Sequence, residues 1–473
     1  YQNQKIKRLF SKEELEDLLI DYNKIALKDK VIPKKVCIWD ETLRDGEQTP
    51  TVYLTLEEKI HLAKLMDEIG VKIIAVGFPA VSDTEKHIVK TIVNEDLKKA
   101  SIVGVARPKI EDIDHCIDAD LKEIVIFMPI SPIFLKTLKQ TKEYQLDKIR
   151  TSIQYAKDNG FKVNWVAEDG TRSEFSHLKN AFQTAIRAGA ERVVLGDTVG
   201  VLTPISTSYL IKRVKEEVVE PLKMNVKMGI HTHNDFGLAV ANTITGVFEG
   251  CEYPHTCING YGERAGNAAL EEVVTVLERM GIDTGIKLKK LPELSAACEK
   301  YFCQPLARNK PIVGDYAFSH ESGLHIAAIL AHPLTYEPIY PKMVGRNRRF
   351  FLGKFSGTKS IEHAIQQEKA HQKKLAQKHK NDFKPEQVLQ QKLRVLDLEI
   401  PSEIIKLIVN EVKSKIESRS KEDLRKSFFK IKKELAKMIK GLTDREFFDI
   451  VNKYAQPYVP EEFKPRLAPK KAS

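Results

Sequence analysis

Short runs of β-branched and other apolar residues recur along the first part of the chain, and a longer amphipathic stretch follows each run. The runs are almost continuously apolar, which is typical of strands buried on both faces of a parallel sheet. The stretches between them end at glycines such as Gly70 and Gly160, as helices often do. This pattern predicts eight strands, at residues 36 to 40, 73 to 78, 101 to 106, 123 to 128, 162 to 167, 192 to 197, 225 to 231 and 255 to 260.

Eight strands that each precede a helix predict an α/β fold, the closed (β/α)8 TIM barrel. The predicted barrel occupies residues 36 to 280, close to the ~250 residues that are typical of this fold. An open doubly wound sheet is the alternative. Polar residues cluster just after the strands, where a barrel has its active site, and this favours the barrel.

The pattern divides the chain into four segments. Residues 1 to 35 are expected to form an N-terminal helical extension, and residues 36 to 280 the catalytic barrel. Residues 281 to 360 mix helix with a connector that contains Pro and Gly, and they are expected to form a connector subdomain. Residues 361 to 473 are Lys- and Glu-rich and predict a helical C-terminal subdomain. Both of these smaller subdomains are expected to pack on the barrel or on a partner subunit.

The composition adds the expected environment. The chain has 473 residues, of which 42% are hydrophobic and 30% charged, and this excludes disorder as its main state. No apolar stretch is long enough for a membrane span and no leader pattern opens the sequence, so we expect a soluble, cytoplasmic protein with no membrane partner. Six cysteines without a C-x-x-C pair predict free thiols in a reducing compartment.

The net charge of +11 raises the alternative of a nucleic-acid-binding protein. Much of the positive charge lies in the last hundred residues, for example at Lys369, Lys373 and Lys374, where it is interleaved with Gln, Glu and His. No nucleic-acid motif accompanies it. The pattern therefore favours a solvated helix face, and we expect no nucleic-acid partner.

The end of the first predicted strand is rich in charge. Residues 40 to 48 read Asp-Glu-Thr-Leu-Arg-Asp-Gly-Glu-Gln, with four acidic groups and one arginine. These groups cannot all be buried without a cation or mutual pairing. A bound metal ion and a set of salt bridges at the barrel mouth both explain this segment.

A second polar cluster favours the metal ion. The seventh strand ends in His231, Thr232 and His233. Residues two apart in an extended segment project to the same side, so both imidazoles can face one ion. With Asp45 available across the barrel mouth, the set suits Zn, Mn, Fe or Co, and Mg also remains open.

Three further segments carry polar residues after strands. Asn267 follows a glycine-rich stretch after the eighth strand, where its side chain can cap a helix or bind an ion. Glu168 ends the fifth strand and Thr198 follows the sixth. There is no G-x-G-x-x-G after the first strand and no Walker loop, so a dinucleotide or NTPase function has no support.

Four motifs occur in order along the chain: RDGEQTP, HTHNDFGLAVAN, NGYGERAGNAALEE and HESGLH. With them the sequence resembles the acetyl-CoA-condensing branch of the DRE-TIM metallolyases, which includes 2-isopropylmalate, homocitrate, citramalate and Re-citrate synthases. The resemblance covers roughly residues 36 to 360. It implies a metal-dependent acyltransferase that condenses acetyl-CoA with a 2-oxo acid and then hydrolyses the thioester, giving a 2-hydroxy dicarboxylic acid and CoA.

The resemblance implies which residues would bind the metal. A divalent ion, Mn, Mg, Zn or Co, would be held by Asp45, His231, His233 and Asn267. It would make the ketone of the 2-oxo acid a better electrophile. Arg44 would stabilise the oxyanion that forms on condensation.

The resemblance also implies which residues act as the general base toward acetyl-CoA, that the connector subdomain of residues 281 to 360 completes the active site, and that two chains associate. Glu168 would work with His325 of the HESGLH motif to remove a methyl proton from acetyl-CoA. Tyr336 matches a tyrosine that in the family usually reaches the site of the neighbouring subunit, which implies a homodimer. Thr198 would bond the substrate carboxylate, and Gln48 and Arg107 are the other expected substrate-binding residues.

The identity of the 2-oxo acid is the most detailed prediction that the sequence allows. Homocitrate synthases have R-F-S-S-E-D on the fifth strand, whose Arg and Ser bind the distal carboxylate of 2-oxoglutarate, whereas residues 164 to 169 here read N-W-V-A-E-D. A pocket with Asn164, Val166 and Val125 predicts a small or branched apolar 2-oxo acid, such as 2-oxoisovalerate or pyruvate, and thus a 2-isopropylmalate synthase-like enzyme.

Other functions stay open at this point. Arg107, Lys136 or Lys139 could supply a cation for a second carboxylate, which would make the protein a homocitrate or Re-citrate synthase acting on 2-oxoglutarate or oxaloacetate. A metal-dependent acyl-CoA lyase is less favoured, because Cys257 is not followed by the glycine-rich loop that carries the catalytic cysteine of such lyases.

Overall fold

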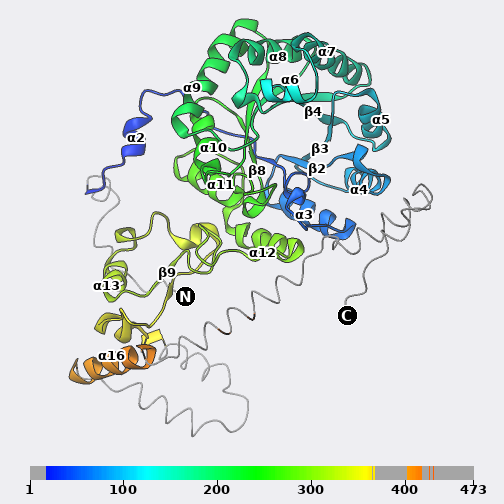
Figure 1. Ribbon diagram of the computed structural model, residues 1–473. Coiled ribbons are helices and arrows are strands. Elements are labelled where there is room, and N and C mark those ends of the chain that lie inside the picture. Colours follow the sequence, from blue (N-terminus) through cyan, green and yellow to red (C-terminus); the bar gives the residue numbers. More distant parts are fainter. Residues whose placement is uncertain (1–17, 365, 368–401, 418–425, 427–429, 431–473) are drawn as a thin grey trace, which may run out of the picture.

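Eight parallel strands form a closed barrel (Figure 1). The structure is a computed structural model that describes residues 18 to 364, 366, 367, 402 to 417, 426 and 430. Strand β1 pairs with both β2 and β8, which closes the sheet and confirms the predicted TIM barrel. The strands are β1 (Trp39–Asp40), β2 (Ile73–Gly77), β3 (Ser101–Ala106), β4 (Glu123–Pro129), β5 (Lys162–Glu168), β6 (Arg192–Asp197), β7 (Lys227–Thr232) and β8 (Tyr253–Thr256).

Helices follow the strands and surround the barrel (Figure 1). The first of them shows how the sequence sets their ends: the Thr55 side chain caps its N-terminus in a capping box with Glu58, and Gly70 ends it at φ 110°. The helices that surround the barrel are α3 (Leu56–Ile69), α4 (Asp83–Val93), α5 (Ile110–Asp118), α6 (Pro132–Thr137), α7 (Lys142–Asp158), α8 (Phe175–Arg187), α9 (Pro204–Val214), α10 (Ala239–Phe248) and α11 (Leu270–Arg279).

Strands β1 to β5 contribute residues to two separate apolar cores, one between the barrel and the helices and one inside the barrel. On β5, Trp165 packs between the barrel and the helices. Its ring lies edge-on to the ring of Phe182, with the centroids 5.4 Å apart. Val166 packs against the separate core inside the barrel, which contains Trp39 and Val125. Since residues two apart share a face, Glu168 projects on the same side as Val166 and ends at the barrel mouth.

Strands β1 and β8 are shortened most relative to the sequence pattern. The backbone N–H of Val36 donates to the carbonyl of Asp283, outside the barrel, so regular pairing in β1 begins only at Trp39. Strand β8 ends at Thr256 because the chain turns at residues 258 to 260, where Asn259 adopts φ 61°. This turn directs the following glycine-rich loop back over the barrel mouth.

The segment after the barrel forms a smaller group of elements beside it (Figure 1). Helix α12 (Leu291–Phe302) packs on α3, and a connector follows. The connector contains α13 (Gly323–Ala331) and a short parallel pair, β9 (Ser319–His320) with β10 (Arg349–Phe350).

Parts of the predicted terminal segments lie outside the described residues. Of residues 1 to 35, the structure describes 18 to 35, which contain the short helix α2 (Tyr22–Ala26). The basic run around Lys369 is not described, whereas α16 (Ser402–Glu417) packs on Ile361. None of the described helices combines the length and the apolar character that a membrane span requires.

Candidate active site

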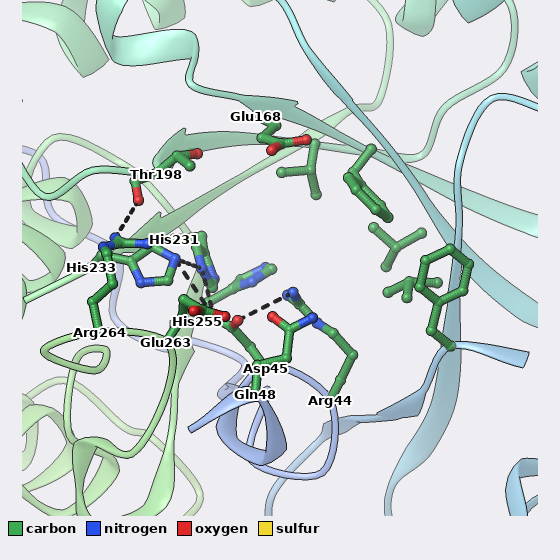
Figure 2. A pocket seen from close by; sticks show the side chains of 16 residues that line it. Arg44, Asp45, Gln48, Glu168, Thr198, His231, His233, His255, Glu263 and Arg264 are labelled. Atoms are coloured by element: carbon green, nitrogen blue, oxygen red, sulfur yellow. Dashed lines mark hydrogen bonds and ion pairs between the residues drawn. The ribbon is translucent and has the colours of Figure 1, made fainter. Parts of the chain in front are cut away.

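A cavity of about 270 Å³ lies at the carboxyl ends of the barrel strands (Figure 2). This is the end of a TIM barrel at which active sites occur. Its wall includes polar residues from the ends of several strands and apolar residues from β2 to β5. The lining residues are Arg44, Asp45, Gln48, Phe78, Val105, Val125, Phe127, Val166, Glu168, Gly196, Thr198, His231, His233, His255, Glu263 and Arg264.

Asp45, His231 and His233 form a compact group of possible metal ligands. The Asp45 Oδ2 atom lies 3.3 Å from His231 Nε2 and 3.7 Å from His233 Nε2, and the two nitrogens are 3.3 Å apart. Two donors that share an ion at ~2.1 Å would lie roughly 3.0 to 3.4 Å from each other. The two 3.3 Å separations lie in this range and the 3.7 Å separation is slightly longer, so the three atoms are close enough together to surround one cation.

Asn267 joins this group from the loop after β8. Its Nδ2 donates to Asp45 Oδ2 at 2.9 Å, and the two side chains are both buried. Its Oδ1 is buried without a hydrogen-bond partner. A buried acceptor that lacks a donor is costly unless an ion or water satisfies it. The four residues that the sequence suggests as metal ligands thus lie together, and they fit a divalent cation.

The charges around Asp45 keep these ligands in the forms that bind metal. Burial alone would raise the pKa of the Asp45 carboxyl, but neighbouring Arg44 and the two histidines hold that pKa far below its usual range. Burial and His231 lower the pKa of His233 to about 4. An ionised carboxylate and a neutral imidazole are the ligating forms of these side chains.

A second group of buried polar side chains, Glu41 and His255, lies next to His231 and was not expected from the sequence. The Glu41 carboxylate accepts a hydrogen bond from Arg44 Nε at 2.8 Å, and its Oε1 lies 3.1 Å from His255 Nδ1. The His255 ring stacks on Trp39, with centroids 4.5 Å apart. Glu41 and His255 therefore hold Arg44 against the cavity. The acidic run after the first strand was the only sequence signal for this pair, because His255 stands inside a predicted strand.

Glu168 and Thr198 lie across the cavity from Asp45 (Figure 2). Burial, together with the adjacent Asp169 carboxylate, raises the pKa of Glu168 to about 7. A carboxyl group with such a pKa can accept or donate a proton near neutral pH. The Thr198 hydroxyl oxygen accepts a hydrogen bond from the backbone N–H of Asp169 at 2.8 Å.

Arg264 also lines the cavity and was not expected from the sequence. Its guanidinium donates to both carboxylate oxygens of Asp235, at 2.8 and 2.9 Å, and to the backbone carbonyl of Thr198 at 2.6 Å. These bonds tie together the loops that follow β6, β7 and β8. Its position in the glycine-rich loop, two residues after Gly262, gave no sign that the side chain bridges other loops.

Two residues expected in the substrate pocket lie elsewhere. Arg107 does not line the cavity, because its guanidinium forms a two-point ion pair with Asp112 at 2.7 and 2.9 Å. Asn164 faces the barrel interior well below the mouth, where it is fully buried and bonded to Glu123 and Arg192. Lys136 and Lys139 do not line the cavity either. Gln48, Val125 and Val166 line it as expected.

His325 and Tyr336 are close to each other but do not line the cavity of their own barrel. Their rings stack with centroids 4.1 Å apart, at an interplanar angle of 29°. His325 lies on α13 of the connector and is partly exposed, as is Tyr336. The pair therefore does not contribute to the cavity that Glu168 of the same chain lines.

Comparisons with known proteins agree with this fold and show the family of the chain. Residues 35 to 298 match the family model described as HMGL-like, and residues 312 to 386 match the model described as homocitrate synthase post-HMGL domain-like. A protein of Ignicoccus hospitalis named "Probable 2-isopropylmalate synthase" is 45% identical over 74% of this chain and 86% of its own. Homocitrate synthase AksA of Methanopyrus kandleri is 44% identical, over 72% of this chain and 84% of its own.

A solved structure shares the barrel. The HMG-CoA lyase of Bacillus subtilis superposes with a TM-score of 0.51 and 21% identity, and the match covers 59% of this chain and 97% of that chain. At this identity the likeness concerns the fold alone. It supports the TIM-barrel architecture independently of the strand pairing.

The geometry of the ligand group makes a direct prediction. Asp45→Asn should weaken Mn²⁺ binding by ~10²-fold or more, because it removes the only anionic ligand of the proposed set while the positive charge of Arg44 stays beside the ion. Isothermal titration with Mn²⁺ measures this. His61→Ala, an exposed histidine bonded to Tyr301, is the matched control and should bind like the wild type. An Asp45→Asn protein that binds one Mn²⁺ per chain with unchanged affinity would contradict the site.

Proposed function

Since the chain belongs to the HMGL-like family, we propose that it is an acyltransferase that condenses acetyl-CoA with a 2-oxo acid, as a 2-isopropylmalate synthase does. The products would be a 2-hydroxy dicarboxylic acid and CoA. The names of the relatives at 44% to 45% identity support this assignment. The single observation that carries it is the arrangement of one cavity, in which possible metal ligands and Arg44 face Glu168.

The first role of the site is to activate the ketone of the 2-oxo acid. A divalent ion, Mn, Mg, Zn or Co, held by Asp45, His231, His233 and Asn267 would supply the Lewis acidity that makes the ketone carbon electrophilic. Arg44 lines the same cavity, and Glu41 holds its Nε in place. Its guanidinium is positioned to stabilise the negative oxygen that develops as the carbon–carbon bond forms. Thr198 would form a hydrogen bond with the carboxylate next to the ketone. Gln48 lines the same cavity and is the other residue proposed to bind the substrate.

The second role is to remove a methyl proton from acetyl-CoA. We assign this to Glu168 acting with His325. Glu168 faces the cavity, and its pKa of about 7 suits a group that takes up and releases a proton at neutral pH. His325 would assist from the connector, where its ring stacks on Tyr336.

This assignment requires two chains. His325 and Tyr336 do not line the cavity of their own barrel, so we propose that the connector of one subunit completes the site of the other in a homodimer. The partly exposed position of the stacked pair supports this. We also propose a cytoplasmic location, which the six free cysteines support.

The apolar side of the cavity points to the substrate. Val105, Val125, Phe127 and Val166 form a wall away from the ligand group. Of the two arginines that line the cavity, Arg264 is already paired with Asp235, and Arg44 is the residue assigned to the developing oxyanion. A second carboxylate on the substrate would therefore meet apolar side chains. A branched apolar acid such as 2-oxoisovalerate fits this wall best.

Homocitrate synthase is the second candidate, and one observation favours it. The match of residues 312 to 386 is to a domain of homocitrate synthases, and a homocitrate synthase is among the relatives at 44% identity. On this assignment the substrate would be 2-oxoglutarate.

A substrate panel separates the candidates. With acetyl-CoA and Mn²⁺, release of the CoA thiol should be ~10²-fold more efficient, in kcat/KM, with 2-oxoisovalerate or pyruvate than with 2-oxoglutarate, because an unpaired carboxylate at the apolar wall is costly. Chelator-treated protein should release no thiol. A preference for 2-oxoglutarate would contradict the pocket assignment, and one for oxaloacetate would indicate a Re-citrate synthase. Thiol release with none of the four acids would contradict the synthase function.

Mixed dimers test the shared site. Glu168→Gln and His325→Ala should each lower kcat by ~10²-fold or more, because loss of a general base acts on the transition state. If a site combines Glu168 of one chain with His325 of the other, unfolding and refolding the two variants together should restore about a quarter of the wild-type kcat, since random pairing makes half of the dimers mixed and each has one intact site. Absence of recovery in verified mixed dimers would place both residues in one chain's site.

A further inference from the structure

Asp169, the residue after Glu168, has an unusual backbone. Its φ and ψ of 54° and 27° lie in the left-handed region, which residues with a Cβ atom seldom adopt and which Asp and Asn adopt more readily than the others. Its carboxylate is fully buried. Backbone of this kind persists where surrounding contacts enforce it, and it gathers at functional sites.

Three donors enforce the position of Asp169. Arg172 makes a two-point ion pair with it, Nε to Oδ1 at 2.7 Å and a terminal nitrogen to Oδ2 at 2.8 Å. The hydroxyl of Ser131 donates to Oδ2 from the loop after β4. The carboxylate is therefore held from the loops that follow β4 and β5.

The enforced conformation acts on two cavity residues. It directs the Asp169 N–H at the hydroxyl oxygen of Thr198, at 2.8 Å. The Thr198 hydroxyl acts as the acceptor in this bond, so its own proton stays available to donate to another group. Glu168 precedes Asp169 directly, so the same backbone also fixes the point from which its side chain enters the cavity.

We infer that Asp169, Arg172 and Ser131 form a positioning unit that sets Glu168 and Thr198 together for the condensation. The inference rests on the proposed function. None of the three residues lines the cavity, so the unit acts through Glu168 and Thr198 and touches no substrate.

Another ion pair in the barrel shows what a purely structural role looks like. Arg150 bonds Asp147 on α7 with the same three-residue spacing, but both side chains are about half exposed and neither contacts a cavity residue. Such exposed pairs contribute little to stability. The Arg172 pair differs because its acidic partner is buried and its backbone bonds Thr198.

The test uses the metal-loaded full chain. Arg172→Gln should raise the dissociation constant of 2-oxoisovalerate by ~10-fold, measured by calorimetry, because Thr198 loses its alignment. It should also lower kcat by ~10-fold or more and increase the isotope effect with methyl-deuterated acetyl-CoA, since proton removal by a displaced Glu168 becomes slower. Arg172→Lys and Asp169→Asn should lose less, because Lys retains a charge and Asn tolerates left-handed backbone.

Arg150→Gln is the matched control and should change none of these values. Unchanged substrate affinity, kcat and isotope effect in both Arg172→Gln and Asp169→Asn, with Mn²⁺ content and melting temperature recorded for each, would overturn the inference. If the exchange at Arg172 prevents folding, Asp169→Asn and Arg172→Lys decide by the same readouts. Because the affinity measurement needs no turnover, a wild type that binds the acid but releases no CoA contradicts the proposed function alone. A wild type that does neither contradicts both.

Discussion

The buried carboxylate of Asp45 is the constraint on which the site depends. A carboxylate that is 2% exposed must be balanced by nearby positive charge or by hydrogen bonds. Arg44, His231 and Asn267 supply these contacts from three different segments of the chain. The loop after β1, the end of β7 and the loop after β8 therefore converge on one group. The same convergence creates the donor set that fits a divalent cation.

The barrel makes this convergence possible. All eight strands run in one direction, so the residues that follow them meet at one mouth. The apolar interior just below it, with Val125 and Val166, limits solvation of the charges above. Burial therefore raises the pKa of Glu168, whereas Asp45 stays ionised because Arg44 is beside it. Two carboxyl groups in one cavity thus have opposite pKa shifts, which suit the two roles proposed for them, Asp45 as a ligand and Glu168 as a base.

Much of this could be predicted from the sequence because it depends on local order. The strand and helix repeat predicts the barrel, and two histidines at strand spacing predict a ligand pair whatever the rest of the chain does. The depth at which a residue lies in the barrel depends on contacts with distant parts of the chain, and the local sequence pattern does not predict it. Asn164, Val166 and Glu168 share one face of β5, yet only the last two reach the cavity, because Asn164 bonds Glu123 lower in the barrel.

The partners with which charged side chains form ion pairs could not be predicted from the sequence either. The strand and helix repeat places Arg107 after a strand, as expected for a substrate-binding residue. Its guanidinium instead forms an ion pair with Asp112, five residues later. The pair of Glu41 and His255 spans almost the whole barrel in sequence and forms only because β1 and β8 are neighbours. The left-handed backbone of Asp169 likewise depends on Ser131 and Arg172, which no periodicity relates to it.

The central claim is that Asp45 organises one metal site at the barrel mouth. Anomalous X-ray diffraction from crystals grown with Mn²⁺ and 2-oxoisovalerate tests it most directly. The account predicts one anomalous peak per chain, within bonding distance of Asp45, His231 and His233, with the acid bound against Val125 and Val166. A peak bonded to Glu41 and His255 instead, or none at the barrel mouth, would contradict it.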